Sequence, residues 1–319
     1  MKKHDQCRFC KTNLEHVFVD LHTSPPSNDF LKEENLDTGE IYYPLKTYVC
    51  KSCWLVQLAE YKKAEALFSD DYVYFSSYSK SWLKHSEDYT AEVIERFKLN
   101  ADSFVVELAS NDGYLLQYMK RANIPCLGIE PTASTAQVAR ERGIETISQF
   151  FGQKCAQELS SKFKKPTLML ANNVIAHVPD VNDFVSGVKT WLAPNGVFTI
   201  EFPHLLQLVK ENQFDTIYHE HFSYYSLFTM SQILRKNGLE VFDVKTLPTH
   251  GGSLRVYSDH GQNPKTAAVS KLLQQETDAG VNNLSFYEGF QEKVDRIKVE
   301  FLEFLVQAKK QGKLVVGYG

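Results

Sequence analysis

From residue 103 onward, short apolar runs alternate with stretches in which apolar residues recur at helical spacing. The apolar runs are 104–108, 126–130, 167–171 and 197–202, and the first helical patterns between them are 114–122 and 134–142. Strands that alternate with helices predict βαβ units and a parallel sheet. Ligands bind at the carboxyl ends of the strands in such sheets, so the loops that follow these runs are the first place to look for a site.

The two ends of the chain have different patterns. The first 60 residues combine Cys, Pro and Tyr with strand-like runs such as 41–45, and 82–98 places its apolar residues near one helical face. After about Pro248, we expect a strand at 253–257, a long amphipathic helix at 285–310 and a strand at 313–319 that enters a glycine turn. A strand-turn-helix unit rarely ends on its turn, so we expect the sequence to be a truncated form of a longer chain.

Composition narrows the class of protein. The chain has 319 residues, 43% of them hydrophobic, and a net charge of −4, which gives no general attraction to nucleic acid. No apolar run approaches the length of a membrane span, and the first six residues lack the apolar stretch of a signal peptide. We therefore expect a cytoplasmic protein with reduced thiols, no membrane partner and no nucleic-acid partner.

Four of the six cysteines form two CxxC pairs, Cys7 with Cys10 and Cys50 with Cys53. Two residues between cysteines let both sulfurs reach one tetrahedral ion at a tight turn, and two such turns complete a four-cysteine zinc site. Four thiolates leave no open position for water or substrate, so the zinc is expected to be structural.

A candidate cofactor loop follows the apolar run 104–108. Its small residues would let the backbone approach a ligand whose carboxylate lies at a helix N-terminus, and the loop is not the GxGxxG of dinucleotide sites. An acidic residue at the end of the next strand can accept both ribose hydroxyls of a nucleoside. These features favour S-adenosylmethionine, although the loop alone fits a generic βα turn about equally well. The predicted cofactor residues are Glu107, Ala109, Asn111, Gly113 and Glu130, with Asn172 and Asn173 after the third strand. Loop capping explains these two asparagines about equally well.

A dense group of ionisable side chains lies at residues 218–226, which read YHEHFSYYS. The HEH triplet is not the HExxH of helical zinc sites. If the segment is extended, His219 and His221 share one face and Glu220 points the opposite way. A histidine near its reference pKa of about 6.5 is a suitable proton acceptor at neutral pH. Considered alone, the segment fits a satisfied, partly buried polar turn slightly better than a catalytic role.

Four motifs in this order carry a resemblance to a known family: the paired CxxC motifs, VELASNDG at 106–113, YHEH at 218–221 and HGGSLR at 250–255. Together they resemble the zinc-containing, S-adenosylmethionine-dependent sugar C-methyltransferases that act on nucleotide-linked 4-keto deoxyhexoses. The resemblance runs over essentially the whole chain. One departure is Ala109, where methyltransferases often carry glycine.

The resemblance implies an α/β fold of three domains. These are a four-cysteine zinc-binding domain at 1–70, a Rossmann-type S-adenosylmethionine domain at 71–246 and the start of a Rossmann-like C-terminal domain at 247–319. The family continues beyond the Gly-Tyr-Gly at which this sequence ends.

The resemblance also implies the chemistry: a base removes the C3 proton beside the C4 ketone, and the resulting carbanion takes the methyl group. It implies His221 as the base, with Tyr218 and Glu220 orienting the substrate or the imidazole. Tyr72 or Tyr74 would reach the sugar, although core packing explains at least one of them equally well. His177 is a secondary candidate for the same cavity.

The turn at 250–255 is the predicted contact to the substrate diphosphate, through backbone amides and a guanidinium. The residues concerned are His250, Gly251, Gly252, Ser253 and Arg255. A tight turn that leads into a strand explains this motif equally well.

The leading hypothesis is therefore C3 methylation of a 4-keto deoxysugar nucleotide, with dTDP as the expected nucleotide. One alternative is a methyltransferase that acts on oxygen or nitrogen of another small acceptor. Another is a non-catalytic zinc-ribbon binding protein, against which the dense Tyr/His/Glu cluster weighs. The sequence leaves the oligomeric state open and is compatible with a monomer.

Overall fold

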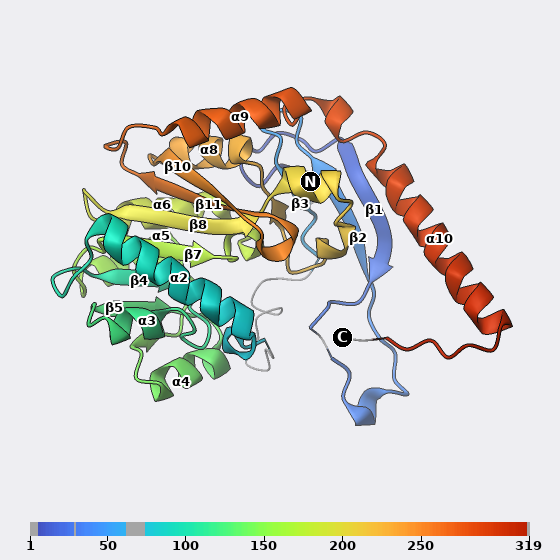
Figure 1. The fold of residues 1–319 in the computed structure, drawn as a ribbon, viewed down its shortest axis with the longest axis horizontal. Helices are drawn as coiled ribbons and strands as arrows, with labels where there is room; N and C mark the ends of the chain where they lie inside the picture. Colours follow the sequence, from blue (N-terminus) through green and yellow to red (C-terminus); the bar gives the residue numbers. More distant parts are fainter. Residues whose placement is uncertain (1–5, 29, 62–73, 318–319) are drawn as a thin grey trace.

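The structure is a computed structural model that describes residues 6–28, 30–61 and 74–317. A seven-stranded sheet with helices on both faces forms the larger part of the molecule, and a smaller antiparallel sheet lies beside it (Figure 1). The predicted α/β class, with an N-terminal cysteine cluster and a central Rossmann-like domain, is confirmed.

The large sheet has the strand order β10-β11-β8-β7-β4-β5-β6. Its strands are β4 (Val105–Leu108), β5 (Cys126–Ile129), β6 (Thr146–Ile147), β7 (Leu168–Asn172), β8 (Val197–Pro203), β10 (Glu240–Leu247) and β11 (Ser253–Asp259). The pairs among β4 to β8 are parallel, while β11 is antiparallel to both of its neighbours. Every residue of β4 and β7 is buried, as expected of strands that are covered by helices on both faces.

The helices of the central domain cover both faces of this sheet (Figure 1). They are α2 (Lys80–Phe97), α3 (Leu116–Arg121), α4 (Ala133–Glu141), α5 (Gln153–Ser160), α6 (Val181–Trp191), α7 (Leu205–Lys210) and α8 (Leu227–Lys236). The predicted helices at 82–98, 114–122 and 134–142 are confirmed with small shifts of their ends. The Ser79 side chain caps the start of helix α2 by accepting a hydrogen bond from the Trp82 N–H, and Lys98 caps its end with a left-handed φ of 53°.

The small sheet has the order β1-β2-β3-β9 and is antiparallel throughout. Its strands are β1 (His16–Ser24), β2 (Tyr43–Val49), β3 (Val56–Leu58) and β9 (Ser223–Tyr224). The first three belong to the N-terminal segment, whereas β9 comes from the central domain. The fourth strand of the zinc-domain sheet is therefore supplied by a segment more than 160 positions further along the chain.

The chain after β10 differs in part from the prediction. The predicted strand at 253–257 is confirmed as β11, but β11 pairs with β8 and β10, so the expected boundary at 247 falls between two paired strands of one sheet. Helices α9 (Ala267–Ala279) and α10 (Phe290–Lys310) follow, and the second begins five residues later than expected. Residues 313–317 are exposed and form no strand, so the expected strand is wrong there, because these residues have no backbone pairing with another described segment; residues 318–319 lie outside the described residues.

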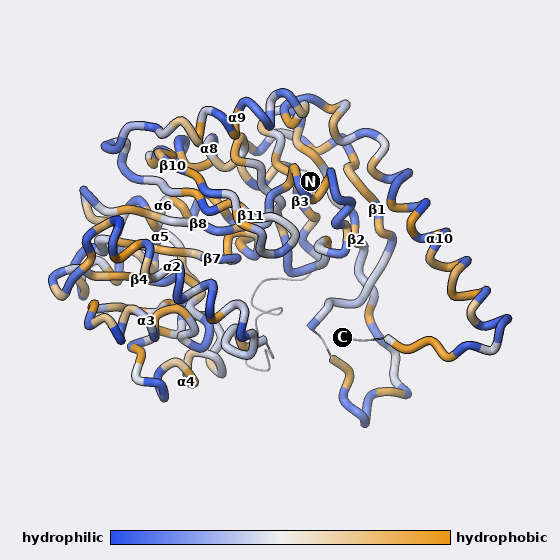
Figure 2. The backbone as a smooth tube through the Cα atoms, viewed as in Figure 1, coloured by the Kyte–Doolittle hydropathy of each residue, from blue (hydrophilic) through white to orange (hydrophobic). Residues whose placement is uncertain are grey.

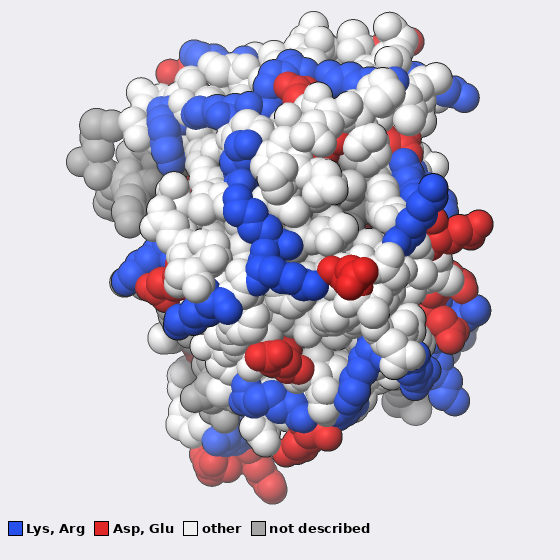
Figure 3. Space-filling model, turned by 90° about the vertical axis from the view of Figure 1, so that its left-hand side faces the viewer, with Lys and Arg blue, Asp and Glu red and all other residues white. Residues whose placement is uncertain are grey.

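Helix α10 runs along β1, and its C-terminal half, in which hydrophobic residues recur along the tube in Figure 2, is largely exposed. The residues that expose large apolar side chains there are Val299, Phe301, Leu302, Phe304 and Val306. Charged residues on the face shown in Figure 3 are of mixed sign, with Lys and Arg interspersed among Asp, Glu and uncharged residues. Among the described residues, no helix combines the length and the apolar character needed to cross a membrane.

Candidate active site and zinc centre

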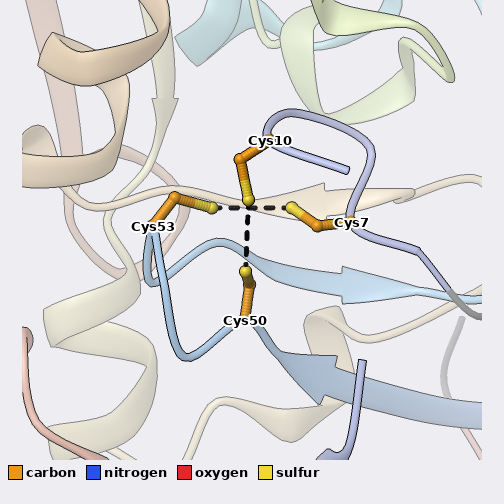
Figure 4. A group of neighbouring side chains, drawn as sticks. All are labelled: Cys7, Cys10, Cys50 and Cys53. Atoms are coloured by element: carbon orange, nitrogen blue, oxygen red, sulfur yellow. Dashed lines mark hydrogen bonds between the residues drawn. The ribbon is translucent and has the colours of Figure 1, made fainter. Parts of the chain in front are cut away.

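The four predicted cysteines meet at one point, with their sulfur atoms pointing toward one another (Figure 4). All four ligand atoms lie within 4.8 Å of one another, and the Cys7–Cys53 and Cys10–Cys50 sulfurs are each 3.5 Å apart. Such a set of soft, converging donors fits a tetrahedral zinc ion.

The two CxxC turns are built alike. The Lys11 N–H donates to the Cys7 carbonyl at 3.0 Å, and the Trp54 N–H donates to the Cys50 carbonyl at 2.8 Å. Both donor residues adopt a left-handed φ, 66° for Lys11 and 64° for Trp54. This repeated geometry aims two sulfurs of each turn at the common point.

A cavity of about 530 Å³ opens at the carboxyl ends of the parallel strands. Most of the predicted catalytic and cofactor residues line it together: His221, Tyr218, Glu220, Tyr74, His177, Ala109, Asn111, Glu130, Asn172, Asn173 and His250. The structure thus joins loops that are far apart in sequence into one site. Tyr72 lies outside the described residues.

The loop after β4 follows an unusual backbone path. Ala109, Asn111 and Gly113 have φ values of 52°, 49° and 77°. A Cβ at Gly113 would lie 2.4 Å from the Ile144 Cδ1, so only glycine fits there. Ala109 and Asn111 line the cavity. Gly113 and the buried Glu107 lie next to them in the chain but do not line it.

Two buried carboxyl groups lie beside this loop, those of Glu107 in β4 and Glu130 after β5. Glu130 follows β5 and accepts hydrogen bonds from the backbone N–H groups of Asn111 at 2.8 Å and Thr132 at 2.9 Å. Burial raises the pKa of Glu130, and burial raises the pKa of Glu107 well above its usual range. Glu130 lines the cavity with lone pairs left over, as a ligand for ribose hydroxyls requires.

Asn172 and Asn173 end β7 at the same cavity. The Asn173 N–H donates to the Glu201 carbonyl at 2.7 Å, and its φ is 55°. Within the described part of the chain, the buried side-chain amide of Asn172 has no hydrogen-bond partner. Because a buried amide without partners is costly, this group fits a polar ligand in the cavity. The residues present therefore fit a nucleoside cofactor.

The YHEH segment forms a turn, in which the His221 N–H donates to the Tyr218 carbonyl at 3.0 Å. The extended alternation considered above is therefore wrong, since Tyr218, Glu220 and His221 all line the cavity. His219 alone faces away, toward the Pro44 carbonyl at 3.3 Å.

His221 has a defined tautomer. Its Nδ1 lies 2.9 Å from the Thr216 carbonyl, which can only accept, so Nδ1 carries the proton. Nε2 is then the acceptor, and the Tyr218 hydroxyl lies 3.0 Å from it. Burial, together with the neighbouring His177, lowers the pKa of His221 well below 6.5. The expectation of an ordinary pKa is therefore wrong, and the cause is the enclosed position of the ring.

His177 lies beside His221, with ring centroids 4.7 Å apart. Burial lowers the pKa of His177 to about 4. Two neutral imidazoles thus lie side by side in the cavity at neutral pH. His250 lines the same cavity and has a strained φ of 51°. Its ring packs against Trp82 in a T-shaped arrangement, with ring centroids 5.3 Å apart.

The other residues of the predicted diphosphate motif are placed elsewhere. The Arg255 side chain is 2% exposed and lies 2.9 Å from the Glu201 carboxylate, inside the sheet. It faces this carboxylate because β11 pairs with β8 and sets residue 255 opposite residue 201. The structure does not bring Gly251, Gly252 and Ser253 to the cavity either; they border a small separate hollow beside His204.

The cavity residues that the sequence did not predict include Asn28, Trp82 and Tyr114. Asn28 lies in the excursion between the two CxxC motifs, and its amide donates to the Glu220 carboxylate at 2.6 Å. The run of two prolines and a serine before it signals a turn, but nothing in the sequence links that turn to residue 220.

Comparisons with known proteins agree with this geometry. A zinc binding domain matches residues 7–68, a methyltransferase domain residues 82–244, and a C-methyltransferase C-terminal domain residues 248–319. The fold and the site thus define a zinc-containing methyltransferase.

One relative is the C-methyltransferase NovU of Streptomyces niveus, which is 34% identical over 320 residues, covering 99% of this chain and 75% of NovU. The chain belongs to this C-methyltransferase family, and it is an S-adenosylmethionine-dependent methyltransferase with a structural zinc site.

Similar solved structures cover the central domain. The PH0226 protein of Pyrococcus horikoshii OT3 has a TM-score of 0.48 at 16% identity, over 60% of this chain and 95% of that one. The magnesium protoporphyrin IX methyltransferase of Synechocystis PCC 6803 has a TM-score of 0.44 at 13% identity, over 55% of this chain and 82% of that one.

Proposed function

We propose that this enzyme methylates C3 of a nucleotide-linked 4-keto deoxyhexose, with dTDP as the expected nucleotide. The observation that supports this most directly is the defined tautomer of His221, whose unprotonated Nε2 faces the Tyr218 hydroxyl in the cavity. Removal of a proton from carbon needs a positioned base in its unprotonated form, and His221 Nε2, next to the Tyr218 hydroxyl, is such a base.

In this proposal the C3 proton leaves as the C4 ketone becomes an enolate. His221 Nε2 is the final proton acceptor, either directly or through the Tyr218 hydroxyl, which passes its own proton to Nε2 and takes the substrate proton. Burial raises the pKa of Tyr218, so its phenol remains protonated in the resting enzyme and can donate to the enolate oxygen or to His221. The low pKa of His221 keeps the base unprotonated at neutral pH.

S-adenosylmethionine, when bound, supplies the methyl group as an electrophile on its sulfonium. Glu130 would hold the ribose hydroxyls, and the Asn172 amide would bind a polar group of the methionine or adenosine part. The chain itself positions the acceptor, removes a proton and excludes water, and such positioning can supply several kcal/mol of the barrier reduction.

Glu220 completes the sugar end of the site. It is buried and is held by the Asn28 amide at 2.6 Å, so its carboxylate is fixed in the cavity wall. A fixed carboxylate can accept a hydrogen bond from a sugar hydroxyl and discriminate against analogues that lack it.

The test is exchange of the C3 proton in D₂O, followed by NMR on a dTDP-4-keto-6-deoxyhexose with the enzyme present. We expect the native enzyme to incorporate deuterium at C3. In His221→Asn, the rate of this incorporation should fall at least a hundredfold. His219→Asn is the matched control, because this neighbouring histidine faces the zinc domain, and it should exchange at close to the native rate. Absence of exchange in zinc-loaded protein that binds S-adenosylmethionine would contradict the proposal.

A further inference from the structure

Asn111 joins the cofactor loop to the short segment that carries Tyr74. We define the tyrosine segment as residues 74–78, which precede α2 and include a short 3-10 helix, Ser76–Tyr78. The Asn111 Oδ1 accepts the Ser76 N–H at 2.9 Å, and its Nδ2 donates to the Tyr74 carbonyl at 3.1 Å. Both ends of the Asn111 amide thus hydrogen-bond to the backbone of this segment, and we call this pair of hydrogen bonds the clamp.

The backbone of Asn111 belongs to the cofactor site. Its N–H donates to Glu130 Oε2 at 2.8 Å, the carboxylate expected to bind ribose. Its φ of 49° places the side chain on the outer side of the loop, toward the tyrosine segment. Asn111 Oδ1 also accepts the N–H of Asp112 at 2.9 Å, which fixes the amide orientation. One residue therefore contacts a cofactor ligand with its backbone and the tyrosine segment with its side chain.

The next residue adds a second, independent contact. The buried Asp112 carboxylate accepts a hydrogen bond from the Ser77 hydroxyl and forms an ion pair with Arg142 at 3.1 Å. The Arg142 guanidinium also donates to the Ser77 hydroxyl at 3.0 Å. Consecutive loop residues thus hold consecutive residues of the tyrosine segment.

Tyr74 and Ser76 line the same cavity as Tyr218 and His221. The aromatic side chains of the tyrosine segment bury only part of their surface against the described residues, since Tyr74 is 50% exposed and Tyr78 is 78% exposed. Its position over the sugar end of the cavity therefore depends on the hydrogen bonds from residues 111 and 112.

We propose that the Asn111 side chain is a positioning group and not a cofactor ligand. It fixes the position of Tyr74, which would contact the sugar, relative to the cofactor loop. The part that concerns the sugar rests on the proposed function. Loss of the side chain should weaken the use of the sugar nucleotide while leaving the Glu130 contact, which the backbone makes, in place.

The test variant is Asn111→Gly, because glycine accepts the left-handed φ and removes only the side chain. Asn123→Gly is the matched control, as Asn123 is an exposed asparagine with a φ of 56° outside the cavity. Backbone amide hydrogen exchange of residues 74–79, measured by mass spectrometry with and without S-adenosylmethionine, reads the clamp without any turnover. We expect at least tenfold faster exchange in Asn111→Gly and no change in Asn123→Gly.

Binding and kinetics then separate positioning from cofactor contact. For Asn111→Gly we expect the Kd for S-adenosylmethionine to stay within threefold and the KM for the sugar nucleotide to rise at least tenfold. Asn111→Asp retains the acceptor for the Ser76 N–H and should restore part of the protection, which also covers the case in which the glycine variant fails to fold.

Unchanged exchange at residues 74–79, or a rise in the cofactor Kd as large as that in the sugar KM, would overturn the proposal. Failure of the sugar chemistry alone would be recognised separately, since the native enzyme would then show no C3 exchange while the clamp still controlled amide exchange.

Discussion

Replacing Arg255 with methionine distinguishes a substrate ligand from an internal ion pair. The Arg255 side chain is 2% exposed and the Glu201 side chain is fully buried, and two guanidinium nitrogens lie 2.9 and 3.2 Å from the same carboxylate oxygen. The other oxygen of Glu201 lies 2.8 Å from His85 Nε2. Among the described residues, removal of the guanidinium leaves the buried carboxylate with the His85 ring and the Thr249 hydroxyl as side-chain partners.

Breaking a buried ion pair by removing one partner costs about 3–5 kcal/mol. We expect the lower end for Arg255→Met, about 3 kcal/mol, because His85 can still partner Glu201 and methionine fills part of the volume. Urea unfolding followed by circular dichroism measures this difference. Arg235→Met is the control, since Arg235 is 59% exposed beside Glu240 and should cost under about 1 kcal/mol.

The double variant Arg255→Met with Glu201→Gln should regain part of the lost stability, because it removes the uncompensated charge. The KM for the sugar nucleotide should stay within threefold in folded Arg255→Met. Full stability together with a tenfold higher KM would refute this reasoning and restore the diphosphate role that the sequence suggested.

Three other changes test the site more briefly. Cys50→Ser should abolish the binding of one zinc per chain and unfold the N-terminal domain first; a zinc-free protein with the native melting temperature would contradict the structural role of the ion. His177 and His221 have pKa values below their unfolded value of about 6.5, so the unfolded chain binds more protons and stability should fall as pH drops from 6.5 toward 4, by at most about 1.4 kcal/mol per pH unit for each histidine. His221→Asn should flatten this slope in urea unfolding, and an unchanged slope would refute the assignment. Gly113→Ala should cost about 2–3 kcal/mol, because its Cβ would clash with Ile144 at a φ of 77°, and adding Ile144→Val should recover part of the loss in melting temperature.

Features that depend on neighbouring residues in sequence could be predicted well. The CxxC spacing is a local pattern, because each pair of cysteines lies on one turn. The four sulfurs converge as expected. The buried strands of the central sheet are short apolar runs, and such runs predict buried strands directly. Glu130 lines the cavity because it directly follows β5, one of the parallel strands whose carboxyl ends meet at one edge of the sheet.

Features that depend on pairing between distant segments could not be predicted. Arg255 alternates like any residue of a strand, and only its register against β8 decides that it faces Glu201. Asn28 reaches Glu220 across 192 positions of sequence, through a path that no local pattern encodes. The depressed pKa of His221 likewise follows from enclosure by several loops, not from the residues beside it.

The pairing of β3 with β9 limits how this enzyme can be recombined with its relatives. Val56 pairs with Tyr224, and the Phe222 carbonyl accepts the Leu58 N–H at 3.0 Å, directly after the turn that carries His221. A chimera that exchanges only the N-terminal 60 residues would place a foreign edge strand against the native β9. Transplants of the metal-binding part should therefore carry residues 217–225 with it, so that the edge and its complement come from the same parent.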